Sequence, residues 1–140
     1  MGIVIDTSVL VTLERAGRSW DDLLSGLKSG TEDDPFVAIA AITVSELLVG
    51  VLRADSKSRR ALRGDFVEQV IGKVTVLSFD LASARVHARV WAGLSGSGET
   101  IGPSDLLIAA TALANGHAVL TENFREFQRV PDLDVLAPLW

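Results

Sequence analysis

The sequence predicts an α/β fold with three layers, α/β/α, around a parallel sheet of four or five strands. Short apolar runs rich in β-branched residues recur along the chain, and segments with apolar residues at helical spacing separate them. Strands that alternate with helices in this way form parallel sheets covered on both faces by helices. A length of 140 residues is typical of one domain, so we expect a single domain over residues 1–140.

The chain opens with a strand and two helices. The strand is expected at residues 3–5, which are β-branched throughout. Apolar residues at helical spacing then predict a helix that begins near Val9 and stops at Gly17. A second, amphipathic helix is expected from Trp20 to a stop near Gly30, because its apolar residues follow the i, i+3, i+4, i+7 pattern.

The middle of the chain repeats this alternation. An acidic turn at residues 31–35 precedes a second strand, expected at 36–40. A third helix is expected from Thr43 to about residue 52, and a helix that is basic at its start and apolar later is expected at 56–72. The apolar run at 74–77 predicts a third strand.

The last third of the chain contains the most apolar predicted helix. Asp80 is expected to cap a helix that runs to about residue 94, and the Ser- and Gly-rich stretch 95–98 is too short to separate domains. From Ser104 onward a helix is apolar on nearly every side and therefore buried, and it ends at Asn115 and Gly116. The remaining strands are expected at residues 118–120 and 135–136.

The composition excludes several classes of protein. The absence of Cys excludes zinc–thiolate sites and thiol nucleophiles. Hydrophobic residues make up 48% and charged residues 22%, which excludes wholesale disorder. No apolar run reaches the roughly 18 residues of a membrane span, and the N-terminus lacks the basic region of a signal peptide. We therefore expect a soluble, cytoplasmic protein with no membrane contact.

Charge is distributed unevenly along the chain. Thirteen Lys and Arg against 18 Asp and Glu give a net charge of −5, which argues against binding nucleic acid through overall charge. Between Arg53 and Arg63, however, five cations face a single acid, Asp55. This basic stretch is a candidate RNA-binding surface if bound cations cancel the acids at the contact, and an ordinary solvated helix face is the alternative interpretation.

Three acids follow strands or begin helices, and each has a structural explanation by itself. Asp6 directly follows the first strand, where it is suited to cap the next helix. Glu46 lies three residues after Thr43, which is the spacing of a capping box. Asp105 lies in the first turn of the buried helix, where the helix dipole favours a carboxylate.

Taken together, the three acids indicate a metal site. The C-terminal ends of parallel strands meet at one edge of a sheet, so these helix starts can converge there. Like charges brought that close are unfavourable unless a cation joins them. Carboxylates without His or Cys suit Mg²⁺ or Mn²⁺, and such ions hydrolyse phosphodiesters by activating water and neutralising developing charge.

Four blocks of the sequence resemble the signature blocks of PIN-domain proteins. The blocks are residues 3–8 (IVIDTS), 43–50 (TVSELLVG), 101–110 (IGPSDLLIAA) and 116–127 (GHAVLTENFREF). Their order and the chain length are similar to those of the VapC toxins of bacterial toxin–antitoxin pairs. The resemblance implies a PIN-like domain and an endoribonuclease that depends on Mg²⁺ or Mn²⁺.

The resemblance also implies roles for individual residues. Asp6, Glu46 and Asp105 match metal ligands of the family. The fourth acidic position is open: Asn123 could ligate through its carbonyl oxygen, or Glu126 could act as a further catalytic acid through water, and the pair is also spaced as a helix cap. The hydroxyls that we expect to orient the carboxylates are those of Thr7, Ser104 and Thr121.

The resemblance further implies partners for the chain, namely a VapB-type antitoxin, an RNA substrate and a second copy in a homodimer. Two apolar stripes are either core or binding surface: Trp20, Leu23, Leu24 and Leu27 in one, and Val86, Val90 and Leu94 in the other. The alternative function is a PIN scaffold that binds RNA or protein without cleaving, which the imperfect fourth acidic position favours.

Overall fold

A five-stranded parallel sheet forms the centre of the protein in the computed structural model, which describes residues 1–28 and 35–140. The strand order is β3-β2-β1-β4-β5, with all four pairings parallel. The strands are β1 (Ile3–Ile5), β2 (Val37–Ala40), β3 (Thr75–Leu77), β4 (Ala118–Leu120) and β5 (Val135–Leu136). The predicted fold class is confirmed, and the predicted stop at Gly30 and most of the acidic turn lie outside the described residues.

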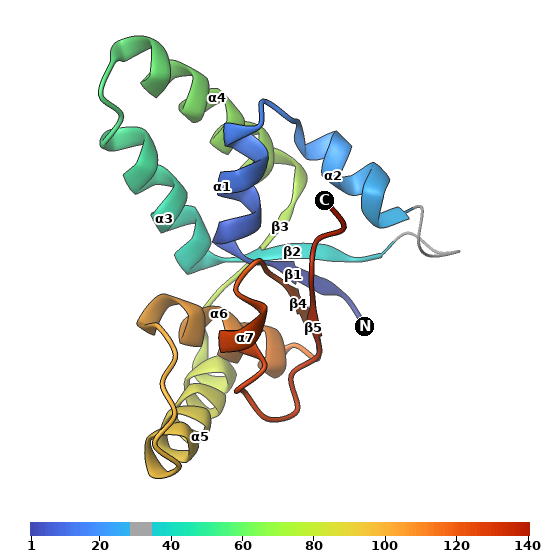
Figure 1. The fold of residues 1–140 in the computed structure, drawn as a ribbon, viewed down its shortest axis with the longest axis vertical. Helices are drawn as coiled ribbons and strands as arrows, with labels where there is room; N and C mark the ends of the chain where they lie inside the picture. Colours follow the sequence, from blue (N-terminus) through green and yellow to red (C-terminus); the bar gives the residue numbers. More distant parts are fainter. Residues whose placement is uncertain (29–34) are drawn as a thin grey trace.

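Helices cover both faces of the sheet, as Figure 1 shows. The helices are α1 (Thr7–Arg15), α2 (Trp20–Lys28), α3 (Ala41–Leu52), α4 (Lys57–Lys73), α5 (Leu81–Gly96), α6 (Pro103–Ala114) and α7 (Phe124–Phe127). Helices α1 to α4 lie on one side, and α5, α6 and α7 lie on the other (Figure 1). None of the helices in the described residues combines the length and the hydropathy needed to cross a membrane.

Alternate residues of the strands supply two separate cores. In β1, Val4 packs with the core formed by α5, α6 and α7, whereas Ile5 packs with the core formed by α1, α2, α3 and α4. The same alternation separates Val119 from Leu120 in β4. Because successive side chains of a strand point to opposite faces, this pattern is what a sheet buried on both sides requires.

The apolar stripes belong in large part to these cores. Trp20 and Leu23 of α2 are buried in the core that α1, α3 and α4 share, and Val90 and Leu94 of α5 are buried in the other core. The interpretation of these four side chains as a free binding surface is therefore wrong. They are instead what holds α2 and α5 against the sheet.

The start of α3 differs from the prediction. The helix begins at Ala41, immediately after β2, and its N-cap is Ala40, which has no side chain able to cap. Thr43 lies inside the first turn and is fully buried. At this turn from strand to helix, the last three residues of β2 and Thr43 of α3 are buried, whereas Ala41 between them is exposed.

Candidate active site

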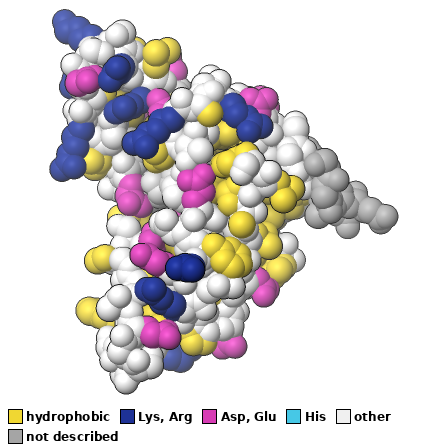
Figure 2. Space-filling view, viewed as in Figure 1, with side chains coloured by type: hydrophobic (Ala, Val, Ile, Leu, Met, Phe, Trp, Pro, Cys, Tyr) yellow, Lys and Arg dark blue, Asp and Glu magenta, His cyan; other side chains and the backbone are white. Residues whose placement is uncertain are grey.

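The predicted acids line one cleft at the C-terminal edge of the sheet. The cleft has a volume of about 320 Å³, and Asp6, Glu46, Asp105 and Asn123 are among its lining residues. Asp6 follows β1, and Asn123 follows β4, the neighbouring strand. Figure 2 shows acidic side chains in the hollow at the middle of the molecule, between the upper and lower groups of helices.

Asp6 is the most deeply buried acid of the cleft, with 1% of its surface exposed. Its Oδ2 accepts hydrogen bonds from the hydroxyls of Ser8 and Thr121, each at 2.7 Å. Its Oδ1 is buried and has no hydrogen-bond partner among the described residues. Asp6 occupies the N-cap position of α1 but makes no capping hydrogen bond, so the capping interpretation of its side chain is wrong.

Glu46 reaches the cleft from the second turn of α3 rather than from a capping box. Because α3 begins at Ala41, Glu46 is the sixth residue of the helix, and its predicted place in the first turn is wrong. Its Oε1 accepts a hydrogen bond of 2.8 Å from the hydroxyl of Thr7. The Thr7 hydroxyl also lies 3.0 Å from that of Thr43, so a pair of threonines connects α1 to α3 beside the cleft.

Asp105 lies in the first turn of α6, after Gly102 at the N-cap and Pro103 at the first helical position. Burial is the main cause that raises the pKa of its carboxyl to about 7, and the negative charge of Asp6 is the next. A hydrogen bond with Glu126 and the charges of Glu126 and Glu46 raise this pKa further. The four carboxyls therefore interact electrostatically, with Glu126 directly beside Asp105.

Asn123 and Glu126 do not form the predicted cap. Asn123 occupies the N-cap position of α7, yet its side chain makes no capping hydrogen bond. Its backbone N–H donates to the hydroxyl of Thr121 at 2.9 Å, the same hydroxyl that donates to Asp6. Thr121 therefore couples the orientation of Asp6 to the loop that carries Asn123.

Three side chains at the cleft were missed by the sequence reasoning: Ser8, Thr12 and Glu122. Glu122 accepts from Thr12 at 2.7 Å through one oxygen and from the indole N–H of Trp140 at 3.0 Å through the other. Its backbone N–H donates to Ser8, which donates to Asp6. A hydroxyl two residues after Asp6 was a usable signal for Ser8, but no local pattern marks the contacts of Glu122.

Two other polar side chains have no hydrogen bond to these carboxylates among the described residues. His87 lies at ring-centroid distances of 5.6 Å from Trp91 and from Phe79, so it packs against aromatic rings of its own part of the chain. The hydroxyl of Ser104 makes no hydrogen bond to these carboxylates among the described contacts, unlike those of Thr7 and Thr121.

The donor set fits a hard divalent cation in its chemistry. All of the donors are carboxylate, amide or hydroxyl oxygens, which Mg²⁺ and Mn²⁺ prefer. The bare Oδ1 of Asp6 and the raised pKa of Asp105 both mark places where a positive charge would be stabilising. Within residues 1–28 and 35–140, however, no three Asp, Glu, His or Cys side chains are grouped closely enough, as they stand, to hold a metal ion. Side chains such as that of Asp105, which bonds with Glu126, would have to turn toward a shared ion.

Comparison with known families agrees with the fold and with the four sequence blocks. The family model for the PIN domain matches residues 3–133 of the chain. The chain belongs to the PIN domain family. PIN-domain VapC nucleases generally depend on a divalent metal ion.

Individual relatives match two thirds or more of the chain. A ribonuclease VapC of Rickettsia bellii is 34% identical over 97% of this chain and 96% of its own. A tRNA(fMet)-specific endonuclease VapC of Shigella flexneri is 31% identical over 69% of this chain and 71% of its own. The solved structure of DNA-bound VapBC from Salmonella typhimurium superposes with a TM-score of 0.81 and 26% identity, covering 98% of both chains.

Proposed function

We propose that this PIN-domain protein is a Mg²⁺-dependent endoribonuclease and the toxin of a VapBC-type toxin–antitoxin pair, formed as a single PIN-like domain over residues 1–140. The observation that carries the proposal is the state of Asp6. Its carboxylate is buried, two hydroxyls fix one oxygen, and the other oxygen has no partner among the described residues in a cleft shared with Asp105. Names of relatives as ribonucleases support the same reaction.

Four side chains of the cleft are the proposed metal ligands: Asp6, Glu46, Asp105 and Asn123. When bound there, Mg²⁺ supplies an activated water and positive charge that offsets the charge developing on a phosphodiester. Thr7 holds Glu46, while Ser8 and Thr121 hold Asp6, so two of the acids keep fixed orientations as substrate binds. The second oxygen of Asp6 stays free for the ion.

Glu126 has a different proposed role from the other acids. It is not among the residues that line the cleft, and it hydrogen-bonds to Asp105. We propose that Glu126 acts through Asp105 by sharing its proton, which keeps this crowded carboxyl stable until a cation replaces the proton. Its part in the reaction is then to control when Asp105 is charged.

The proposed partners are an RNA, a VapB-type antitoxin and a second copy of the chain, in the cytoplasm. Relatives solved as VapBC complexes support the antitoxin, and a tRNA-specific relative supports an RNA substrate. An apolar cavity of about 360 Å³ between α5 and α6, beside the 60% exposed Trp91, supports the homodimer. Light scattering should give twice the chain mass of 14.9 kDa, and the chain mass itself at micromolar concentration would contradict the dimer.

A non-cleaving PIN scaffold is not favoured, because Asp6, Glu46 and Asp105 are all present in one cleft. The test is incubation of the purified chain with a mixed pool of RNA, with Mg²⁺ and with a chelator. We expect new 5′-phosphate and 3′-hydroxyl ends with Mg²⁺ and none with chelator. Binding of RNA without any cleavage, at every divalent ion tried, would instead support the scaffold.

A further inference from the structure

One cation stands at the mouth of the acidic cleft. Arg15, the last residue of α1, lines the cleft and also the neighbouring cavity of about 140 Å³ between α1, α3 and α4. Glu46 and Val11 line both spaces as well, so the cleft and the cavity adjoin at these residues. Arg15 is exposed to solvent at the junction.

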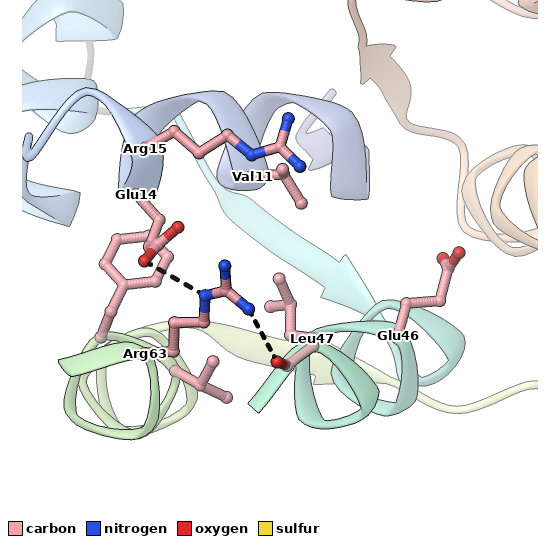
Figure 3. A pocket seen from close by; sticks show the side chains of 9 residues that line it. Val11, Glu14, Arg15, Glu46, Leu47 and Arg63 are labelled. Carbon is pink, nitrogen blue, oxygen red and sulfur yellow. Dashed lines mark hydrogen bonds and ion pairs between the residues drawn. The ribbon is translucent and has the colours of Figure 1, made fainter. Parts of the chain in front are cut away.

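The side chain of Arg15 points toward the acids. Side chains of an α-helix lean toward its N-terminus and cover the preceding turn. The N-terminus of α1 is at Asp6, so an arginine on this helix extends back in the direction of the carboxylates. Figure 3 shows the guanidinium of Arg15 over Val11, one turn back along α1, on the way to the side where Glu46 stands.

Arg15 also differs from Arg63 in the contacts of its side chain. Among residues 1–28 and 35–140, no hydrogen bond or ion pair joins the side chain of Arg15 to another residue. Arg63, in the adjoining cavity, donates to the Gly50 carbonyl at 3.1 Å and lies 3.8 Å from a carboxylate oxygen of Glu14. The donors of Arg63 are thus partly used by the fold, whereas the full set of Arg15 remains available to a ligand.

The electrostatic setting identifies the kind of ligand. Among the residues that line the cleft in the described chain, Arg15 is the one Lys or Arg, against Asp6, Glu46, Asp105 and Glu122. A strand of RNA approaching these acids is repelled by them, and a bound divalent ion cancels part of that repulsion near the ion alone. A guanidinium at the mouth of the cleft attracts the RNA phosphate adjacent to the one at the metal ion, and it can bind that phosphate through two parallel hydrogen bonds.

We propose that Arg15 forms a phosphate-binding subsite for single-stranded RNA, which holds a phosphate adjacent to the one being cleaved and leads the strand into the groove between α1 and α3. The proposal rests on the proposed ribonuclease function and adds to it the direction in which the substrate leaves the cleft. Arg15 contacts the substrate but has no part in bond breaking.

The test compares Arg15→Ala, Arg15→Lys and, as control, Arg85→Ala, an exposed arginine on α5 in the opposite layer. Each is combined with Asp105→Asn to prevent cleavage, and binding of a fluorescently labelled single-stranded RNA is followed by anisotropy. Because the Arg15 side chain has no hydrogen-bond or ion-pair partner in the described part of the chain, the melting temperature of the Ala variant should match that of its Asp105→Asn parent, which checks that the variant is folded.

We expect Arg15→Ala to weaken RNA binding about tenfold, since it removes a charge-assisted contact. The slope of log affinity against log salt, between about 50 and about 200 mM, should fall by about 0.7, the value for one phosphate of a single strand. Arg15→Lys should keep the slope and lose part of the affinity, while Arg85→Ala should change neither. Equal behaviour of Arg15→Ala and Arg85→Ala would overturn the proposal.

Two further outcomes distinguish an RNA subsite from a protein contact and from a failure of the ribonuclease function. If Arg15→Ala weakens binding of the antitoxin but not of RNA, the partner of Arg15 is an acidic group of a protein, and the RNA subsite is wrong. If the unmutated chain binds RNA but cleaves none in Mg²⁺, the proposed ribonuclease function fails, while the binding comparison still decides the role of Arg15.

Discussion

The acidic cleft and the basic stretch of the α3–α4 corner are both clusters of like charge, but they differ in what surrounds each charge. Asp6 in the cleft is 1% exposed. In the basic stretch (residues 53–63), the side chains of Arg59 and its partner Asp55 are 64% and 72% exposed. Figure 2 shows Lys and Arg side chains standing out over the α3–α4 corner and acidic side chains in the hollow below.

The consequence of this difference is electrostatic. Water screens the charges of the basic stretch, and local groups take up several of their donors: Asp55 for Arg59, the Leu52 carbonyl for Arg60 and the Gly50 carbonyl for Arg63. Such exposed pairs contribute little to stability. In the cleft, burial and the negative charges of the neighbouring acids raise the pKa of Asp105 to about 7. Water therefore screens the repulsion between these acids less than it screens the charges of the basic stretch. Burial, more than the number of charges, distinguishes a reactive site from a solvated surface.

The largest expected effect comes from making the same substitution in both regions. Asp6→Asn and Asp105→Asn should each lower RNA cleavage by at least about a thousandfold, because each removes a proposed ligand of the reacting metal. Asp55→Asn, the matched change in the basic stretch, should leave cleavage within about twofold. The rate of cleavage of one labelled RNA in Mg²⁺ checks this prediction. Equal rates in all three variants would contradict the assignment of the cleft, and not the basic stretch, as the reacting site.

The pH dependence of stability should also separate the regions. With the pKa of Asp105 raised from 3.8 to about 7, the folded chain binds a proton that the unfolded chain releases between these values. In chelator, the contribution of Asp105 to stability is therefore fully present below about pH 4 and is lost as pH rises through about 7. Between pH 5 and pH 8, the melting temperature of Asp105→Asn should rise by about 3 °C relative to that of the unmutated chain. A constant difference would contradict the shared proton.

A smaller effect is expected from the hydroxyls that hold Asp6. Thr121→Val should weaken Mg²⁺ binding about tenfold, because it removes a 2.7 Å hydrogen bond to Asp6 and the acceptor for the Asn123 N–H. Thr121→Ser keeps the hydroxyl and should restore most of the affinity. Calorimetric titration with Mg²⁺ measures both, and failure of the Ser variant to recover would point to packing rather than orientation.

The smallest effect is expected from the basic stretch. Reversing Arg59 and Arg60 to Glu should weaken RNA binding about threefold and flatten its salt dependence, because fewer counterions are released per complex in the variant. Metal affinity should stay unchanged. Anisotropy at several salt concentrations checks this, and an unaltered salt slope would assign both residues to a solvated helix face.

The sequence predicted those parts of the molecule that local signals determine. The β-branched run of residues 3–5 located β1, and the apolar run of residues 118–120 located β4. The position of Asp6 and Asp105 beside strand and helix ends predicted that they share an edge of the sheet. The start of α3 was predicted two residues late, because Thr43 matched a capping box locally, whereas in the structure Thr43 is buried inside a helix that begins at Ala41. Tertiary packing overrode the cap.

Contacts between distant segments had no signal in the sequence. Glu122 meets Thr12, which is 110 residues away in the chain, and Trp140, which is 18 residues away. Which arginine of the chain remains unpaired at the cleft also depends on neighbours that come together in three dimensions, as the contacts of Arg63 with Gly50 and Glu14 show. The sequence predicts which types of charged residue a nuclease site needs, but it does not predict which of these side chains the fold leaves without a partner.

Titration of the chain with Mn²⁺, followed by the loss of the electron paramagnetic resonance signal of the free ion, measures metal binding at the acidic cleft. We expect one ion bound per chain, with an affinity that rises as pH passes about 7 and Asp105 loses its proton. Asp6→Asn should abolish this binding, and Asp55→Asn should retain it. Undiminished Mn²⁺ binding by Asp6→Asn, at every pH, would contradict the assignment of the cleft as the metal site.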